Sequence, residues 1–247
     1  MVREISITPI RSVDRVFDII DSFVTFGEDL SIEMIMKETK LPKATVYRLL
    51  YTLELRGLIK YDAQKKTYAL GLKFLTYGHI LDQKNEVLNV AKSILDELQQ
   101  MVNQTVMMAV PDGEKMVYVY SKENEHGLKF SSEKGRRRAI TYGVIGKVFM
   151  SHMDQQRVEQ LLGAEQYAQF QLARKRILTD KYYTEYEETN PGVNGMATGI
   201  IFRNDVCQAV IAIVGPSIIF KGDLLREGEQ QLLIARNKIS AKLNGIL

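Results

Sequence analysis

The chain is poor in the residues that mark secreted and metal-binding proteins. Its single cysteine, Cys207, cannot form an intrachain disulfide. The three histidines, His79, His126 and His152, are far apart in the sequence, and no cysteine cluster accompanies them. The ligand spacing of a zinc finger or zinc knuckle is therefore absent, and we expect neither a cofactor nor a metal ion.

Long apolar runs are also missing. No segment approaches the roughly 18 to 20 apolar residues that a membrane span requires. The N-terminal stretch, which Arg3, Glu4 and Arg11 interrupt, lacks the apolar core of a signal peptide. We therefore expect a cytoplasmic protein that does not enter a membrane. The apolar fraction of 45% and the charged fraction of 26% are ordinary for a globular protein, and 247 residues are enough for two modest domains.

Charge is unevenly distributed in the N-terminal part of the chain. Residues 1–39 carry four basic and eight acidic side chains, a net charge of −4, whereas residues 40–73 carry eight basic and two acidic side chains, a net charge of +6. The whole chain has a net charge of only +3. Positive charge is thus concentrated in one short stretch, which favours a local contact with an anionic partner.

Three amphipathic helices are expected in this region. Ser12 is predicted to cap the first, which ends near Gly27, and Ser31 the second, a short one. Pro42 is then well placed just before or at the first turn of the third. Apolar residues recur at helical spacing in the first helix at Val13, Val16, Phe17, Ile20, Phe23 and Val24. In the third helix the buried face is predicted to consist of Val46, Leu49, Leu50 and Leu53.

The third helix has a polar, basic free face and a hairpin behind it. Gly57 is its expected C-cap, and residues 58–61 can pair with residues 67–70 as a two-stranded wing. A short helix, a tight connection, a third helix and a wing make up the winged helix-turn-helix plan. In that plan the third helix enters the major groove of DNA, where its first turns reach base edges and basic side chains meet phosphates.

Several residues are therefore candidates for DNA contact. Arg48 is the best placed for a guanine contact or a phosphate clamp, and the wing tip would reach flanking backbone. The predicted DNA-binding residues are Lys43, Ala44, Thr45, Tyr47, Arg48, Tyr51, Lys65 and Lys66. The alternative, a merely solvated polar face, leaves the wing and the local charge reversal without explanation.

The segment SIEMIMKETKLPKATVYRLLYTLELRGLIKYDAQKKTYALGLKFLTYG resembles the winged-helix domain of the IclR family of bacterial transcriptional regulators. The matching features are LPKATVYRLL, the TL before RGLI, and YALGLKFL, which ends the wing and starts a linker helix. The resemblance continues in GRRRAITYGVIGKVFMSH, EYEETNPGVNGMATGI and AVIAIVGP, and so covers nearly the whole chain.

The second half of the sequence is typical of an α+β domain. A long helix is expected after residue 84, and a helix is expected at residues 224–243. Strands are predicted at residues 105–110 and 115–121, joined by a turn at Pro111-Asp112-Gly113, and at residues 195–202 and 206–214, joined by residues 203–205. Hairpins of this kind indicate an antiparallel sheet.

The resemblance implies how the domains divide. It implies a winged helix-turn-helix domain at residues 1–71, a linker helix at residues 72–84, and an effector-binding domain of GAF-like fold at residues 85–247. The last is expected to have an antiparallel sheet with flanking helices and a ligand pocket under mobile loops.

The same resemblance implies the lining of that pocket. The corresponding positions here are Val144, Ile145, Glu185, Gly195, Ala212 and Val214. Several relatives hold small carboxylates or aromatic acids, often with polar groups on the last strand, where this chain has the apolar residues Ala212 and Val214. This departure favours a more apolar, or differently oriented, effector.

We expect a transcriptional regulator that binds operator DNA as a homodimer or homotetramer, because helix-turn-helix proteins normally read two half-sites. A repressor is the expected mode of action, and activation is left open. The small-molecule effector must bind one spacing of the two DNA-binding heads better than another. The helical stretch from about Leu72 to Val102 would transmit the change.

Two other functions are weighed against this one. The first is an enzyme with a catalytic C-terminal domain and a DNA-localising N-terminal domain, for which no convincing nucleophile, base or metal set is present. Glu187 and Glu188 do not supply one, because adjacent helical residues diverge, and the end of a surface helix is expected there. Glu185 beside a polar cleft, with a raised pKa, would favour this alternative. The second is an architectural DNA-binding protein, which predicts a C-terminal core without a pocket.

Overall fold

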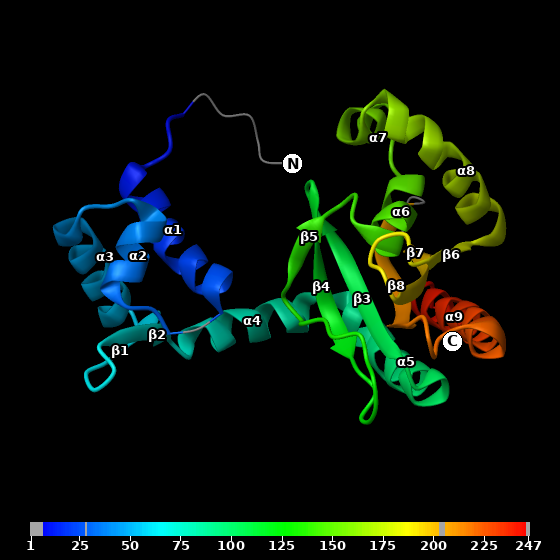
Figure 1. Ribbon diagram of the computed structural model, residues 1–247, viewed down its shortest axis with the longest axis horizontal. Coiled ribbons are helices and arrows are strands. Elements are labelled where there is room, and N and C mark those ends of the chain that lie inside the picture. The colour runs from blue at the N-terminus through cyan, green and yellow to red at the C-terminus, as the bar shows by residue number, and fades with distance from the viewer. Residues whose placement is uncertain (1–6, 28, 203–205, 246–247) are drawn as a thin grey trace. The chain divides into compact units, whose positions relative to one another are not determined.

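The computed structural model describes residues 7–27, 29–202 and 206–245, so Arg3, Glu4 and the turn predicted at residues 203–205 lie outside the described residues (Figure 1). The chain divides into two compact units, residues 1–84 and residues 85–247. Each unit has its own cluster of buried apolar side chains.

The first unit combines helices with a small hairpin. Its elements are α1 (Arg11–Phe26), α2 (Ile32–Thr39), α3 (Lys43–Leu55), β1 (Ile59–Asp62), β2 (Thr67–Leu70) and α4 (Lys73–Lys84). One cluster buries side chains from the first three helices and from both strands, among them Ile19, Phe23, Ile35, Val46, Leu50, Ile59 and Tyr68. Leu30 exchanges two backbone hydrogen bonds with Tyr68, of 2.9 and 2.8 Å, and so ties the α1–α2 loop to the wing.

Helix boundaries in this unit differ slightly from those predicted. The N-cap of α1 is Ile10 and makes no side-chain bond, so the prediction of Ser12 as the cap is wrong: Ser12 lies one residue inside the helix. Ser31 does cap α2, since its hydroxyl accepts from the Met34 N–H at 3.3 Å. Arg56, not Gly57, is the C-cap of α3. Gly57 follows with φ +69° and turns the chain into the wing.

The wing and α4 meet at a close backbone contact. β1 and β2 are antiparallel, with Ile59 opposite Leu70. A Cβ added at Gly71 would lie 2.3 Å from the Gly57 carbonyl oxygen, so this position accepts no larger residue without a backbone shift. The Lys73 ammonium donates to the Arg56 carbonyl at 3.0 Å, which anchors the start of α4 to the end of α3.

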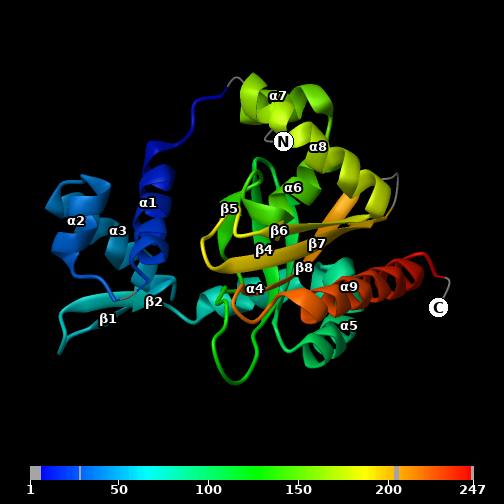
Figure 2. The ribbon, with the colours of Figure 1, turned by 45° about the vertical axis from the view of Figure 1, so that its right-hand side comes forward.

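The second unit is a sheet covered by helices on both faces (Figure 2). Its helices are α5 (Glu86–Val102), α6 (Gly143–Ser151), α7 (Gln155–Leu162), α8 (Ala164–Asp180) and α9 (Gly222–Leu243). Its strands are β3 (Thr105–Asp112), β4 (Lys115–Lys122), β5 (Arg137–Ala139), β6 (Tyr182–Tyr186), β7 (Val193–Ile201) and β8 (Cys207–Pro216). Within the described residues the strand order is β5-β4-β3-β8-β7-β6, and every pairing is antiparallel. The predicted α+β class and antiparallel sheet are confirmed.

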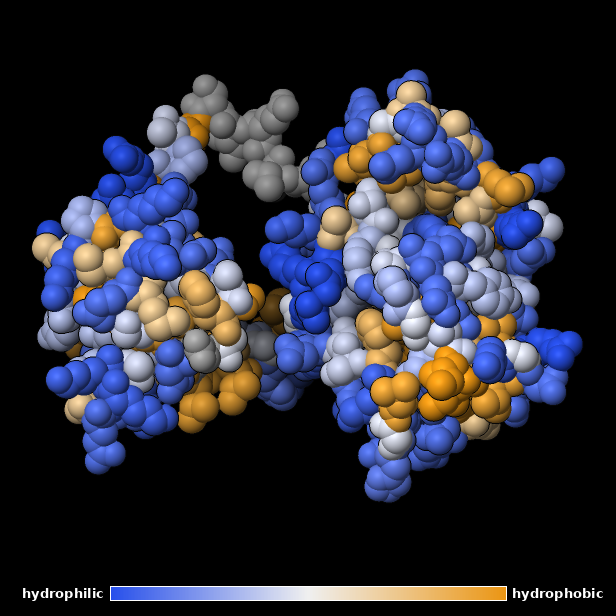
Figure 3. Space-filling model, in the orientation of Figure 1, coloured by the Kyte–Doolittle hydropathy of each residue, from blue (hydrophilic) through white to orange (hydrophobic). Residues whose placement is uncertain are grey.

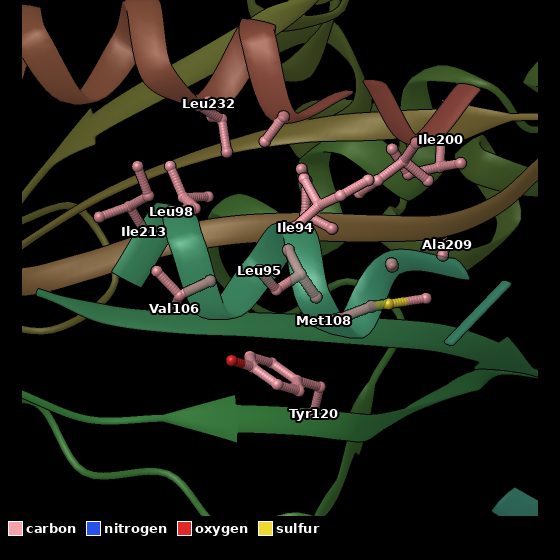
Figure 4. Packing of buried hydrophobic residues seen from close by; sticks show 14 of the residues in the cluster. Ile94, Leu95, Leu98, Val106, Met108, Tyr120, Ile200, Ala209, Ile213 and Leu232 are labelled. Carbon is pink, nitrogen blue, oxygen red and sulfur yellow. The ribbon is translucent and has the colours of Figure 1, made fainter. Parts of the chain in front are cut away.

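The strands divide their side chains between two cores. Because alternate residues of a strand point to opposite faces, Val106 and Met108 of β3 pack against α5 and α9, while Met107 and Ala109 pack on the α6 side. Figure 4 shows the first of these cores, where Ile94, Leu95 and Leu98 of α5 meet side chains from the strands.

Several elements of the second unit were not predicted, and others have boundaries that differ from the predicted ones. Pro111 and Asp112 continue β3, so the turn starts at Gly113 and not at Pro111. α7, α8, β5 and β6 had no counterpart among the predicted elements. Glu187 and Glu188 follow the strand β6, so the helix end expected there is wrong. Asn85 separates α4 from α5 and caps α5 by accepting from the Leu88 N–H at 3.0 Å.

Candidate functional site

The free face of α3 carries the residues predicted to contact DNA. Lys43, Ala44, Tyr47, Arg48 and Tyr51 are exposed, since Val46, Leu50 and Leu53 turn the other face into the core. Thr45 is half-buried, and so is Leu49, which was predicted to be buried. The Lys43 ammonium lies 5.9 Å from the centre of the Tyr47 ring, a cation–π contact that holds two candidate residues together.

A cleft of about 280 Å³ lies between α1 and α3. Arg15 and Ser12 line it from α1, and Thr45, Arg48 and Thr52 line it from α3. Sequence analysis did not select Arg15, although a basic residue one turn into α1 was visible. Arg15 and Arg48 thus border the same cleft.

The wing tip is ordered by an aspartate turn. The Asp62 carboxylate accepts backbone N–H bonds from Gln64 at 2.9 Å and Lys65 at 3.1 Å. These bonds, with Lys65 and Lys60 nearby, hold the pKa of the Asp62 carboxyl below its usual range. Lys65 and Lys66 are both exposed on this turn, and Lys65 makes a long ion pair of 3.8 Å with Asp29. Both lysines are thus presented to solvent.

In the second unit, an inner cavity of about 30 Å³ opens at the N-terminus of α6. Five of the six predicted effector residues line it: Val144, Ile145, Glu185, Gly195 and Val214. Ala212 does not. It is fully buried two residues before Val214, where it packs in the core on the α6 side.

Residues that sequence analysis did not select complete the inner cavity. They are Met107, Tyr118, Phe130, Tyr142, Gly143, Thr189, Asn190 and Val193. The Tyr142 hydroxyl and the Asn190 side chain are 3.1 Å apart and hydrogen-bonded. The Arg138 guanidinium lies 4.9 Å from the Tyr142 ring centre. These residues come from β3, β4, β7, the start of α6 and the connecting loops, and contacts between such separate segments leave no local pattern in the sequence.

The start of α6 offers hydrogen-bond donors to this cavity. Its N-cap, Tyr142, supplies no side-chain acceptor, and the Gly146 N–H is bonded to the Tyr142 carbonyl. The N–H groups of the preceding helical residues have no acceptor within a helix, and such a terminus favours an anion. Gly195 lets Val144 pack closely against β7, because a Cβ there would lie only 3.2 Å from Val144 Cγ1.

Glu185 enters the cavity as part of an ion-pair network. Its carboxylate lies 3.2 Å from the Lys147 ammonium, which also contacts the Glu188 carboxylate. Burial by itself lowers the pKa of Lys147, but the hydrogen bond with Glu188 and the charges of Glu185 and Glu188 outweigh it, and the pKa is raised. Lys147 therefore keeps its positive charge, which is paired with the Glu185 and Glu188 carboxylates.

A larger outer cleft adjoins the inner cavity. It has a volume of about 610 Å³ and lies between α6, α8 and the residues that follow β6. Tyr142, Gly143 and Thr189 line both spaces. Lys147 and Glu188 line only the outer cleft, whereas Glu185 lines only the inner cavity.

Within the described residues, no three His, Cys, Asp or Glu side chains gather in a way that could hold a metal ion. Among the helices of the same residues, none combines the length and apolar content needed to cross a membrane.

Comparison with known proteins agrees with both units. Residues 12–63 match the IclR helix-turn-helix domain, and residues 79–241 match the bacterial transcriptional regulator IclR C-terminal domain. The HTH-type transcriptional regulator XynR of Escherichia coli is 30% identical over 77% of this chain and 80% of its own. The HTH-type transcriptional regulator KdgR of the same bacterium is 26% identical over 95% of this chain and 93% of its own.

The fold has solved counterparts as well. The crystal structure of a transcriptional regulator of this type from Alicyclobacillus acidocaldarius superposes with a TM-score of 0.83 at 16% identity, covering 95% of this chain and 99% of the other. The family models together span most of the sequence. The chain therefore belongs to the IclR family of bacterial transcriptional regulators, with an N-terminal helix-turn-helix domain that binds DNA and a C-terminal domain that binds an effector.

Proposed function

We propose that this regulator binds operator DNA through α3 and the wing, as a homodimer or a dimer of dimers, and that a small molecule in the inner cavity changes that binding. The domains are residues 1–71 for DNA, residues 72–84 for the linker, and residues 85–247 for the effector. The observation that carries the proposal is the exposed basic face of α3 beside a wing with two exposed lysines. Repression, by occupation of the operator, is the proposed mode of action.

The proposed role of each residue in DNA binding follows from its position on α3 or on the wing. Lys43, Ala44 and Thr45 occupy the first turn and would reach base edges or the nearest phosphates. Tyr47, Arg48 and Tyr51 follow on the exposed face, and Lys65 and Lys66 would contact flanking backbone. Arg15, beside Arg48 on the cleft between α1 and α3, would add a phosphate contact.

Exposed apolar side chains support self-association of the first unit. Along α1, Phe17 and Val24 are 57% and 73% exposed, and α4 has no buried residue, with Leu75 and Leu81 each 70% exposed. Apolar areas interrupt the hydrophilic surface of this unit in Figure 3. An amphipathic helix whose apolar residues stay exposed in one chain is best explained by burial against a second copy. Two copies also provide the two recognition helices that paired half-sites need.

The inner cavity is proposed as the effector site. Val144, Ile145, Glu185, Gly195 and Val214 line it, and Ala212 supports it from the core. The N-terminus of α6 favours an anionic group. Glu185 can accept a hydrogen bond from a hydroxyl group, and Val214 supplies an apolar wall. An effector with one carboxylate fits these groups.

The effect of effector binding would be transmitted to the DNA-binding domain through α5 and α4. An effector acts only to the extent that it binds one spacing of the DNA-binding heads better than another. Asn85, which caps α5 directly after α4, is the junction between the two units.

We propose no catalysis for this chain. The relatives are transcriptional regulators. Glu185, whose surroundings were to decide the enzyme alternative, is paired with the Lys147 ammonium. The inner cavity weighs against an architectural protein without an effector. A cytoplasmic location, where chromosomal DNA is accessible, is part of the proposal.

The test is fluorescence anisotropy of labelled DNA from upstream of the protein's own gene, with scrambled DNA of the same length as a control. We expect tighter binding to the upstream DNA and a steep decrease in affinity with salt, because phosphate contacts release counterions. No binding to either DNA at low salt would contradict the proposal.

A further inference from the structure

The exposed surface of α3 divides into two stripes. The first lines the cleft between α1 and α3, and its members on α3 are Thr45, Arg48, Leu49 and Thr52. Their spacing of three and four residues places them on one face of the helix. This first stripe carries one cation, Arg48, among hydroxyl and aliphatic groups.

The second stripe is aromatic and runs beside the wing. Tyr47, Tyr51 and Glu54 follow the same helical spacing, and the two tyrosines are 48% and 63% exposed. Burial raises the pKa of the Tyr68 phenol on β2, and the nearby Tyr47 and Glu54 raise it further. Because such an electrostatic effect decreases with distance, the second stripe lies next to β2.

The Tyr47 ring is oriented by a neighbour on the same stripe. One turn earlier, the Lys43 ammonium lies 5.9 Å from the centre of the ring. On the wing, the Tyr61 and Tyr68 rings pack with their centres 4.8 Å apart, and Tyr68 belongs to the buried core. Tyr47 therefore presents an oriented aromatic ring, about half of it exposed, on the surface proposed to contact DNA.

Thymine is the base that such a ring can select. In the major groove the other three bases present only hydrogen-bond donors and acceptors, whereas thymine adds a 5-methyl group to its acceptor. A phenol has an apolar face and a single hydroxyl group, so it cannot make the bidentate hydrogen bonds that identify guanine or adenine. Tyr47 begins the second turn of α3, within the part of a recognition helix that reaches base edges.

We propose that Tyr47 determines specificity by packing its ring against the 5-methyl group of a thymine in each half-site. Arg48, on the first stripe, acts independently of this methyl group. The inference rests on the proposed binding of operator DNA through α3, and it adds the kind of base that the second stripe selects.

The test removes the methyl groups from the DNA and the ring from the protein. Footprinting with the full-length protein first locates the protected segment upstream of its gene. That segment is made with thymidine and with deoxyuridine, which lacks the 5-methyl group and pairs with adenine in the same way. Fluorescence anisotropy measures the affinity of the wild type, Tyr47→Phe, Tyr47→Gln and Arg48→Ala for both DNAs. Tyr186→Gln is the matched control, because Tyr186 is exposed in the second unit.

We expect the wild type to bind the thymidine DNA at least about fourfold more tightly than the deoxyuridine DNA, since burial of one methyl group is worth about fourfold in affinity. Tyr47→Phe and Tyr186→Gln should keep this ratio of affinities. Tyr47→Gln should bind the two DNAs equally, because it has no ring to contact the methyl group. Arg48→Ala should bind both DNAs more weakly with the ratio unchanged.

Equal binding of the two DNAs by the wild type would overturn the inference. A ratio that persists in Tyr47→Gln, or that Tyr47→Phe or Arg48→Ala abolishes, would overturn it as well. The same titrations separate this inference from the proposed function. A wild type that prefers neither DNA over scrambled DNA would contradict operator binding itself, whereas operator binding without a methyl effect would contradict only the role of Tyr47.

A second measurement needs no variant protein. Deoxyuridine replaces the thymidines one at a time in the DNA that the wild type binds. A direct contact predicts a loss of affinity that is confined to matching positions in the two half-sites. An even loss over all positions would overturn the inference, because it indicates a changed DNA shape and not a contact.

Discussion

The Lys147 ammonium lies 3.2 Å from the Glu185 carboxylate, although the two residues are 38 positions apart in the sequence. Glu185 is almost completely buried, with 8% of its side chain exposed, and Lys147 is 21% exposed. A buried carboxylate without a partner is strongly unfavourable. This ion pair therefore does two things: it stabilises the second unit and it sets the charge between the inner cavity and the outer cleft.

Removal of Lys147 should destabilise the second unit. In Lys147→Met the Glu185 carboxylate stays buried without its cation, and we expect the free energy of unfolding to fall by about 3 kcal/mol. The double variant Lys147→Met/Glu185→Gln should recover most of that loss, because no buried charge is then left unpaired: Glu188, which also loses the lysine, is 43% exposed to water. Urea denaturation at pH 7 measures both, and equal stability of Lys147→Met and the wild type would contradict the role of the pair.

Replacement of Arg48 should weaken DNA binding without unfolding the protein. Arg48 is exposed on α3, so Arg48→Ala removes a DNA contact and no core packing. We expect the affinity for operator DNA to fall by about tenfold or more, and the salt slope to fall by about one for each recognition helix that is bound. Lys175→Ala, an exposed site on α8, is the control. A folded Arg48→Ala protein with wild-type affinity would rule out this role.

Gly71 should tolerate no side chain. Because a Cβ there meets the Gly57 carbonyl at 2.3 Å, Gly71→Ala must move the base of the wing. We expect a loss of about 2 kcal/mol in stability of the first unit, with weaker DNA binding. Gly78→Ala is the matched control: it lies within α4 with nothing within 4 Å of the new Cβ, and alanine favours a helix. Thermal unfolding that is the same for both variants would contradict the close contact.

Exposed leucines on α4 should support self-association. Leu75→Glu places a charge on a side chain that is 70% exposed, so folding of one chain should be little affected. We expect the variant to dissociate to smaller species at concentrations where the wild type is oligomeric, as measured by sedimentation velocity. Leu128→Glu, exposed in the second unit, should leave assembly unchanged. A Leu75→Glu protein that keeps its oligomeric state would place the interface elsewhere.

His152 should make the second unit sensitive to acid. Burial lowers the pKa of His152 from 6.5, and Lys181, Arg236 and Arg174 lower it further. The folded protein thus favours the neutral imidazole while the unfolded chain binds a proton more readily, so stability is full above pH 6.5 and falls as the pH decreases below it. In His152→Gln the slope of stability between pH 7 and pH 5 should be shallower. His126→Gln, at an exposed position, should keep the wild-type slope, and an unchanged slope in His152→Gln would contradict this assignment.

Local sequence patterns were sufficient to predict the recognition helix and the hairpin of the first unit. The buried residues Val46, Leu50 and Leu53 on one face of α3, and the pairing of β1 with β2, depend on neighbours fewer than about 15 residues away. Such elements can be recognised in a sequence from the periodicity of its apolar residues and from residues typical of turns. The hairpin of β3 and β4 was found for the same reason, although its turn starts later than predicted.

The periodicity of apolar residues did not predict which of them the chain itself buries. Phe17 and Val24 follow the helical pattern of α1 as well as the buried residue Phe23 does, and yet both are exposed in the chain. The pattern marks a side chain as apolar, but a second copy can cover it as well as the same chain can.

By itself, the sequence determined the helix-turn-helix plan, the positive charge on α3 and the wing, and the antiparallel hairpins, because each of these arises between residues close along the chain. Only the tertiary structure decided which residues meet at the inner cavity and the outer cleft. Thr105 pairs with Val214 across the sheet. Such long-range pairings, made when the two cores pack, are what bring Tyr118, Glu185 and Val214 to the start of α6.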